Sequence, residues 1–447
     1  MGESARVFRG FAPIFLAFLR VQNRPKSLPR LGFRIIQQAL IKEKLGISDR
    51  ETIEQIKENP YLQYFIGKEY YSNEAPFEAS TMVHFRQRIS ASVVKEINKR
   101  MVEKSREEWE EVPEKKSGEE RGKENRGKLL MDATIGPADI RYPTDVGLLN
   151  EARKVTEKVI DILYESLKGK LNKKPRTYRQ KARKKYLAIA KKRKPSRKER
   201  KKAQKKQLQY IKRNLKHIEG LIEEEARLER LNSKEYRKFL IANEIYRQQK
   251  WMWENNTEKI EDRIVSLTQP HIRPIKRGKA GADTEFGAKI SASCYYGDVF
   301  LEREGEDNYN ESGELKAQVE AYKEYTGYYP ESVHVDKIYR TRENRKWCKE
   351  KGIRISGTPL GRPPKNMSRE AKKQAQLDER VRNEIEVKFG LGKRRFSLNR
   401  VMTKLAETSE TAIAVTFLVM NLSVLYRRQA SCLFLAQFYR YLQVYLG

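Results

Sequence analysis

The chain has 447 residues and carries 94 lysines and arginines against 60 aspartates and glutamates, a formal net charge of +34. This charge is larger than solubility requires and indicates a polyanionic partner. Hydrophobic residues make up 38% of the sequence, enough for a sizeable core, which excludes a purely basic disordered tail. The three cysteines form no CxxC pair, so the sequence supports neither a disulfide framework nor a zinc site, and a reducing cytosol is the expected compartment.

The apolar segments do not predict membrane insertion. The longest uncharged run covers residues 411–426 and contains Thr416, Asn421 and Ser423, so it is expected to be a buried helix. The stretch around Phe8 to Phe15 lacks the long apolar block and the cleavage site of a signal peptide. We therefore expect neither a membrane partner nor secretion.

Composition divides the first third of the chain in two. Apolar residues recur at a spacing of three to four between residues 33 and 100, which predicts an all-helical domain over residues 1–104, used for DNA binding or for dimerisation. Residues 105–126 are rich in Glu, Lys and Gly, which is typical of an exposed charged linker. A domain boundary is expected near residue 127.

The next segment combines a short apolar strand with a basic helical insertion. The strand is expected over residues 129–135, and Thr144 with Asp145 is expected to start a helix ending near Gly169. Between Lys173 and Lys216, 22 of 44 residues are Lys or Arg, and helical spacing resumes from Leu208. We predict that residues 145–261 form this insertion.

The basic insertion is the clearest candidate surface for nucleic acid. Lysine and arginine neutralise phosphates and release counterions, and interleaved tyrosines could pack on sugars or bases. A solvated helical hairpin without a ligand is the alternative. The tyrosines concerned are Tyr178, Tyr186 and Tyr210, and the predicted DNA-binding cations are Arg183, Lys184, Lys185, Lys191, Lys192, Arg193, Arg197 and Lys198.

The remaining sequence predicts a mixed α/β layer. A hairpin is expected from strands 286–296 and 299–302, followed by a helix over 312–325, a strand over 333–336, a helix over 342–350 and a strand over 353–356. A helix after Ser368 is expected to stop at Gly390 and Gly392, and a last helix is expected over 406–426. The predicted core therefore combines residues 127–144 and 262–430, with a tail at 431–447.

Three acids within this core are candidate metal ligands. Asp132 and Asp336 lie in apolar strands, and Glu386 lies beside the apolar stripe of a helix. Buried acids need a partner or a metal, and hard cations such as Mg²⁺ prefer carboxylate oxygens. Two such ions can promote the attack on a phosphodiester, so these acids predict metal-assisted phosphoryl transfer. Arg382 and Lys393, four residues before and seven after Glu386, are expected to contact substrate phosphates.

Other interpretations of these residues stay open. Arg382 and Glu386 could be an ordinary ion pair on a solvated helix. The rival carboxylates are Asp139, Asp283 and Glu285, and His334 is either a base or a structural histidine.

The arrangement of these motifs resembles the DDE transposases of bacterial and archaeal insertion sequences, of the insertion-sequence-four and insertion-sequence-five type. The resemblance rests on Asp132 followed by Pro143-Thr144-Asp145, on Asp336 followed by an aromatic and a basic helix, and on Arg382-x3-Glu386-x6-Lys393. The family signature starts with a tyrosine three residues before the arginine, where this chain has Glu379.

The resemblance implies an RNase H-like mixed sheet with flanking helices. It also implies a homodimer that binds the terminal inverted repeats of double-stranded DNA, cleaves to expose 3′-hydroxyl ends and joins them to target DNA. Two Mg²⁺ ions, which Mn²⁺ can replace, and a cytoplasmic, nucleoid-associated prokaryotic location belong to the same expectation. The alternatives are a catalytically inactive, transposase-derived DNA-binding protein and an RNase H-like nuclease of another purpose.

Overall fold

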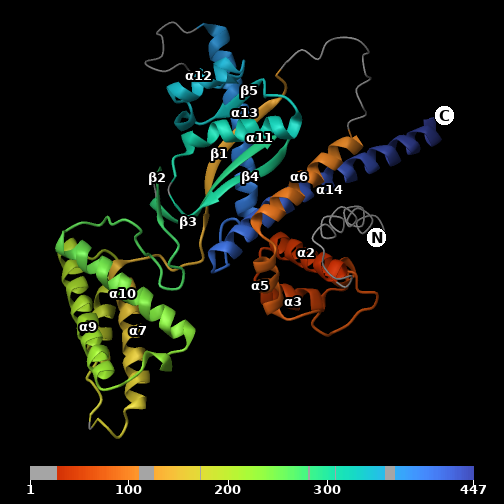
Figure 1. Cartoon of the computed structure of the whole chain (residues 1–447). Helices are drawn as coiled ribbons and strands as arrows, with labels where there is room; N and C mark the ends of the chain where they lie inside the picture. The colour runs from red at the N-terminus through yellow and green to blue at the C-terminus, as the bar shows by residue number, and fades with distance from the viewer. Residues whose placement is uncertain are drawn as a thin grey trace. The chain divides into compact units, whose positions relative to one another are not determined.

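A computed structural model describes residues 28–109, 125–171, 173–279, 282–307, 309–357 and 368–446. The chain forms two compact units, one from Met1–Ala138 with Ala288–Gly447 and the other from Asp139–Gly287. Figure 1 shows the elements of both units coloured along the chain. The predicted basic insertion, residues 145–261, lies within the second unit.

The first unit begins with helices and continues into the sheet. Its helices are α2 (Leu28–Leu45), α3 (Asp49–Glu58), α4 (Pro60–Phe65), α5 (Ala79–Arg88), α6 (Ala91–Trp109), α11 (Glu314–Thr326), α12 (Arg342–Glu350), α13 (Arg369–Arg395) and α14 (Ala406–Leu446). Its strands are β1 (Lys128–Pro137), β4 (Asp298–Gly305), β5 (Ser332–Val335), β6 (Arg354–Ile355) and most of β3 (Ala282–Tyr295), and its short 3-10 turns are η2 (Glu311–Gly313) and η3 (Lys337–Tyr339).

The strands form a six-stranded mixed sheet. Its order is β2-β3-β1-β5-β6, and β4 pairs with β3. The strands β1, β5 and β6 run parallel, while β3 and β4 form the antiparallel hairpin predicted around Gly297. The fold is thus mixed α/β, as the sequence predicted.

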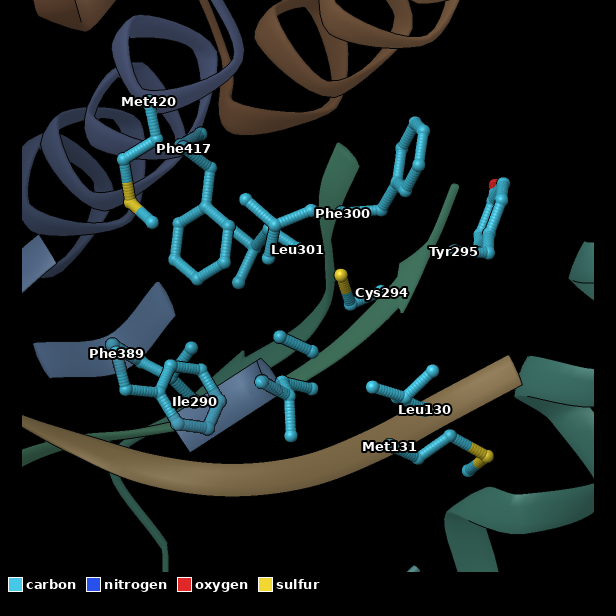
Figure 2. Packing of buried hydrophobic residues seen from close by; sticks show 14 of the residues in the cluster. Leu130, Met131, Ile290, Cys294, Tyr295, Phe300, Leu301, Phe389, Phe417 and Met420 are labelled. Atoms are coloured by element: carbon cyan, nitrogen blue, oxygen red, sulfur yellow. The ribbon is translucent and has the colours of Figure 1, made fainter. Parts of the chain in front are cut away.

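Strand β1 lies within the core of the first unit. Leu129, Leu130 and Met131 are almost completely buried, because β1 has neighbouring strands on both sides and helices in contact with it. Figure 2 shows Leu130 and Met131 on this strand, with Phe417 and Met420 of α14 beside Leu301 of β4. This buried strand provides a rigid support for Asp132.

Helix α14 covers the core and packs along α6. Its buried Asn421 donates to the Val299 carbonyl at 2.8 Å and to Asn98 Oδ1 at 3.0 Å, and accepts from the Val299 N–H at 2.9 Å. Residues Ala406–Leu425 are long and apolar enough to cross a membrane, with a mean hydropathy of 1.5, yet 67% of this stretch is buried inside the protein. The burial agrees with the predicted core helix.

The second unit is a helical bundle with a short strand pair. It contains α7 (Asp145–Ser166), α8 (Arg179–Ala190), α9 (Arg197–Glu223), the turn η1 (Leu228–Arg230), α10 (Ser233–Glu254), β2 (Pro274–Lys279) and the start of β3. Thr144 caps α7, as predicted, by accepting from the Gly147 N–H at 3.1 Å. Asp145 accepts from Gln204, Gln249 and Arg263 at 2.9, 2.9 and 2.6 Å, and so links α7 to α9, α10 and the following loop.

Several predicted boundaries were wrong. Helix α13 does not stop at Gly390 and Gly392 but continues to Arg395. A Cβ at position 392 would lie 3.1 Å from Leu398 and 3.2 Å from the Met420 sulfur, so this glycine permits close packing and does not end the helix. Helix α14 continues past Tyr426 to Leu446, and strand β5 ends at Val335, one residue before Asp336.

Candidate active site

Asp132 and Asp336 lie side by side at the end of the β1–β5 pair. The parallel register aligns Met131 with Val335, so the next residue of each chain is the aspartate. Side chains at aligned positions of parallel strands share a face of the sheet, and the preceding residue on that face of β5, His334, lies 3.8 Å from Asp378 of α13. Both aspartates therefore lie at the end of the strands, on the face of the sheet that α13 covers.

Asp132 is partly buried, and the burial disfavours ionisation of its carboxyl group. Its pKa is raised to about 6, chiefly by burial and to a smaller extent by the charges of Glu311 and Asp336. The Ala133 N–H, which donates to Asp132 Oδ1 at 2.8 Å, and the charge of Arg382 lower the pKa without compensating for the burial. A cation beside this carboxylate would remove the penalty.

Asp336 is exposed and caps the short turn that follows β5. Its Oδ1 accepts from the Lys337 N–H at 2.6 Å. Arg340, four residues later, folds back and donates to the Val335 carbonyl at 2.7 Å. Burial lowers the pKa of Arg340, whereas the charge of Asp336 raises it, so the two side chains attract each other.

Glu386 lies on helix α13 and is hydrogen-bonded to Arg382 of the same helix. Arg382 donates from Nη1 to Glu386 at 2.8 Å, and from Nε and Nη2 to Glu379 at 3.1 and 2.5 Å. The Arg382 side chain is 14% exposed, whereas the Glu379 and Glu386 side chains are 55% and 51% exposed. These hydrogen bonds raise the pKa of Arg382 and lower that of Glu379.

The structure thus groups the three predicted metal ligands with Arg382, which was predicted to contact DNA phosphates. Asp132 is within electrostatic range of both Asp336 and Arg382, and Arg382 is bonded to Glu386. Lys393 lies two helical turns after Glu386, inside α13 and not beyond a glycine stop. Among the described residues, no set of three acidic, histidine or cysteine side chains is already arranged to hold a metal ion.

The donor set nevertheless fits Mg²⁺ in its chemistry. All three candidate ligands offer carboxylate oxygens, and the burial of Asp132 favours a neighbouring cation. In this structure Glu386 is engaged by Arg382. Its carboxylate would have to turn from the arginine to contribute to a metal site.

The sequence-based interpretation missed Arg340 and assigned no role to Glu379. Arg340 follows Asp336 by four residues, but in an irregular turn this spacing does not predict whether the two side chains lie close together. Glu379 was visible only as a departure from the family signature. His334 is buried beside Ser332 and Asp378, and burial lowers its pKa, which favours the structural alternative.

Helices α8 and α9 and the loop that connects them expose all eight cations predicted to bind DNA in this segment. Of these eight, within the part of the chain that the structure describes, only Lys192 forms an ion pair, with Glu199. The prediction for two tyrosines was wrong, because Tyr186 and Tyr210 are 9% and 8% exposed and pack inside the bundle. Tyr178 keeps an exposed ring, with Arg176, Lys181 and Arg213 lying 5.1, 5.8 and 4.8 Å from its centroid.

Comparison with protein families assigns both ends of the first unit. The family described as "Transposase DDE domain" matches residues 333–423, which contain Asp336, Arg382 and Glu386, and the family described as "Transposase domain (DUF772)" matches residues 9–88. The matched parts are those of a transposase. Together these two matches indicate a DDE-type transposase of an insertion sequence.

The chain also resembles one curated protein over part of its length. The chain is 32% identical over 142 residues to "Uncharacterized protein ORF8 in nfe locus" of Rhizobium meliloti, and the match covers 32% of this chain and 62% of that protein. The chain therefore spans less than two thirds of the relative it matches. No solved structure matches the chain significantly.

Proposed function

We propose that this protein is an active DNA transposase that uses Asp132, Asp336 and Glu386 as metal ligands. The observation that carries the proposal is the adjacency of Asp132 and Asp336 in the β1–β5 register, on the face covered by the helix of Glu386. The sheet order, with β1 central and parallel to β5, supports an RNase H-like core. The insertion-sequence-four or insertion-sequence-five subtype is part of the same proposal.

Each residue has a distinct part in the proposed chemistry. Two Mg²⁺ ions, when bound, would activate a water or 3′-hydroxyl nucleophile and stabilise the leaving oxygen of the phosphodiester. Asp132 and Asp336 would hold the ions from the rigid sheet, and Glu386 would complete the coordination from α13. Arg382 and Lys393 would contact the phosphates of the DNA end.

The basic helices α8 and α9 would bind the DNA backbone. Their exposed lysines and arginines carry positive charge and hydrogen-bond donors that can contact phosphates of any sequence. The inverted repeats would be recognised elsewhere, and the helices α2 to α5 are the candidate for this role. Handling two DNA ends together would require a homodimer, and the expected location is the cytoplasm, on the nucleoid.

The test is a cleavage and strand-transfer assay with Mg²⁺ on DNA carrying the ends of the element. Wild type is compared with Asp132→Asn, Asp336→Asn and Glu386→Gln, and Glu370→Gln in the first turn of α13 is the control. We expect all variants to bind the DNA in a gel-shift assay, and only the three site variants to lose cleavage. Binding without cleavage by the wild type, with Mg²⁺ and with Mn²⁺, would instead favour the inactive DNA-binding alternative.

A further inference from the structure

Glu379 occupies the centre of an alternating series of charges that joins the two sides of the site. Its Oε1 accepts two hydrogen bonds from Arg382, whose third bond goes to Glu386. Arg340 attracts both Glu379 and Asp336. The order of charges is therefore Asp336, Arg340, Glu379, Arg382, Glu386, with a candidate metal ligand at each end.

The spacing on α13 explains how one guanidinium can serve two acids. Glu379, Arg382 and Glu386 follow one another at i, i+3 and i+7, so all three project from the same face of the helix. Arg382 uses Nε and Nη2 for Glu379 and Nη1 for Glu386. This division leaves Glu386 with a single hydrogen bond from Arg382, where a planar guanidinium could otherwise form a bidentate pair.

Without Glu379, the charges would interact differently. Arg382 would lose two of the three hydrogen bonds described above and could turn fully toward Glu386. Arg340, whose pKa the charge of Arg382 lowers, would also lose the attraction of the Glu379 carboxylate. Both changes would oppose a divalent cation at the site, because one masks a ligand and the other adds uncompensated positive charge.

We propose that Glu379 is a positioning residue that holds Arg382 and Arg340 in place, so that Arg382 keeps only one hydrogen bond to Glu386 and metal ions can compete for the carboxylates of Glu386 and Asp336. This inference rests on the proposed function. It assigns Glu379 no contact with metal or DNA. The role is specific to the glutamate, because the tyrosine of the family signature brings no negative charge to this position.

The test measures metal binding directly, on the full-length protein without DNA. Mn²⁺ is titrated into wild type, Glu379→Ala and Glu379→Gln, and the free ion is followed by electron paramagnetic resonance. The Glu370→Gln variant is the matched control, since Glu370 is an exposed glutamate of the same helix. Binding of end DNA in EDTA and thermal unfolding are measured on the same samples.

We expect Glu379→Ala to weaken Mn²⁺ binding by roughly three- to tenfold, the scale of a lost charge-assisted contact. Glu379→Gln should lie between alanine and wild type, because it keeps an acceptor but loses the charge. DNA binding in EDTA should stay unchanged or become tighter, since a negative charge is removed. A purely structural role would instead lower the unfolding temperature and weaken DNA binding together.

A double-variant comparison separates positioning from direct coordination. In an Arg382→Gln background, Glu379→Ala should cost much less Mn²⁺ affinity than in wild type, because the arginine through which it acts is gone. An equal cost in both backgrounds would make Glu379 a metal ligand and overturn the proposal. Equal Mn²⁺ binding by wild type and Glu379→Ala would also overturn it, whereas no Mn²⁺ binding by wild type would overturn the proposed metal site itself.

Discussion

The substitution Asp132→Asn should stabilise the protein while it abolishes DNA cleavage. Burial raises the pKa of Asp132 from 3.8 to about 6, so the ionised carboxylate is disfavoured in the folded state. The difference of about 2.2 pKa units, at about 1.36 kcal/mol each, corresponds to a cost of about 3 kcal/mol well above pH 6. Asparagine removes the charge and can still accept the Ala133 N–H through Oδ1.

The raised pKa of Asp132 determines how the stability of the wild type changes with pH. Between pH 3.8 and about 6 the unfolded chain loses the Asp132 proton while the folded chain retains it, so wild-type stability falls with rising pH and then levels. From the two pKa values, the cost is about 1.6 kcal/mol at pH 5 and about 3 kcal/mol at pH 7.5. The stabilisation of Asp132→Asn relative to wild type should therefore grow by about 1.4 kcal/mol between these pH values.

Urea denaturation at pH 5 and pH 7.5 in EDTA measures this difference, with Glu370→Gln as an exposed-acid control. The other titrating groups cancel when each variant is compared with wild type at the same pH. Saturating Mg²⁺ should then stabilise wild type and reduce the advantage of the variant. An Asp132→Asn advantage that is absent, or equal at both pH values, would refute the link between the burial of Asp132 and its charge.

Two single substitutions and one triple substitution test other parts of the structure. Gly357→Ala should destabilise the protein by at least about 2 kcal/mol in thermal unfolding. Gly357 has φ +92°, and a Cβ at this position would lie 2.0 Å from the Arg340 guanidinium. Unchanged stability would mean that Arg340 packs elsewhere. Asn421→Ala should cost about 2 kcal/mol in urea denaturation, since it leaves the Val299 N–H and Asn98 without their partner, and a neutral effect would contradict this buried network. Replacing Arg183, Lys184 and Lys185 by Gln should weaken DNA binding for all sequences and make the slope of log K against log[salt] shallower by up to about 3 × 0.9, or 2.7. A slope equal to that of wild type in electrophoretic titrations would remove α8 from the DNA surface.

The sequence predicted those parts of the fold that depend on local pattern. Apolar runs identified β1 and the β3–β4 hairpin, and Thr144 marked the start of α7, because alternation and capping are properties of a few neighbouring residues. The adjacency of Asp132 and Asp336 could be suspected from two acid-bearing strands, but the register that aligns them is a tertiary fact. Glu386 was grouped with them because it lies beside the apolar stripe of a helix, and the family resemblance supported this grouping.

The errors arose where tertiary packing overrides local preference. Gly392 lies within α13 because Leu398 and Met420 approach too closely for a side chain. Tyr186 and Tyr210 lie in a run rich in cations, yet they point into the bundle that α7 and α9 build. The role of Glu379 could not be predicted, since its partner Arg340 belongs to a turn 39 residues earlier in the chain, by the difference 379 − 340.

The charge balance of the site is itself an argument for bound cations. Asp132, Asp336, Glu379 and Glu386 place four carboxylates around the end of the β1–β5 pair, and Arg340 and Arg382 supply two positive charges. The deficit is concentrated at Asp132, where burial and like charges raise the pKa of a carboxyl group held on a rigid strand. Divalent ions would supply the missing positive charge. The stability of the protein should therefore be lower, and should depend more strongly on pH, when the metal ions have been removed.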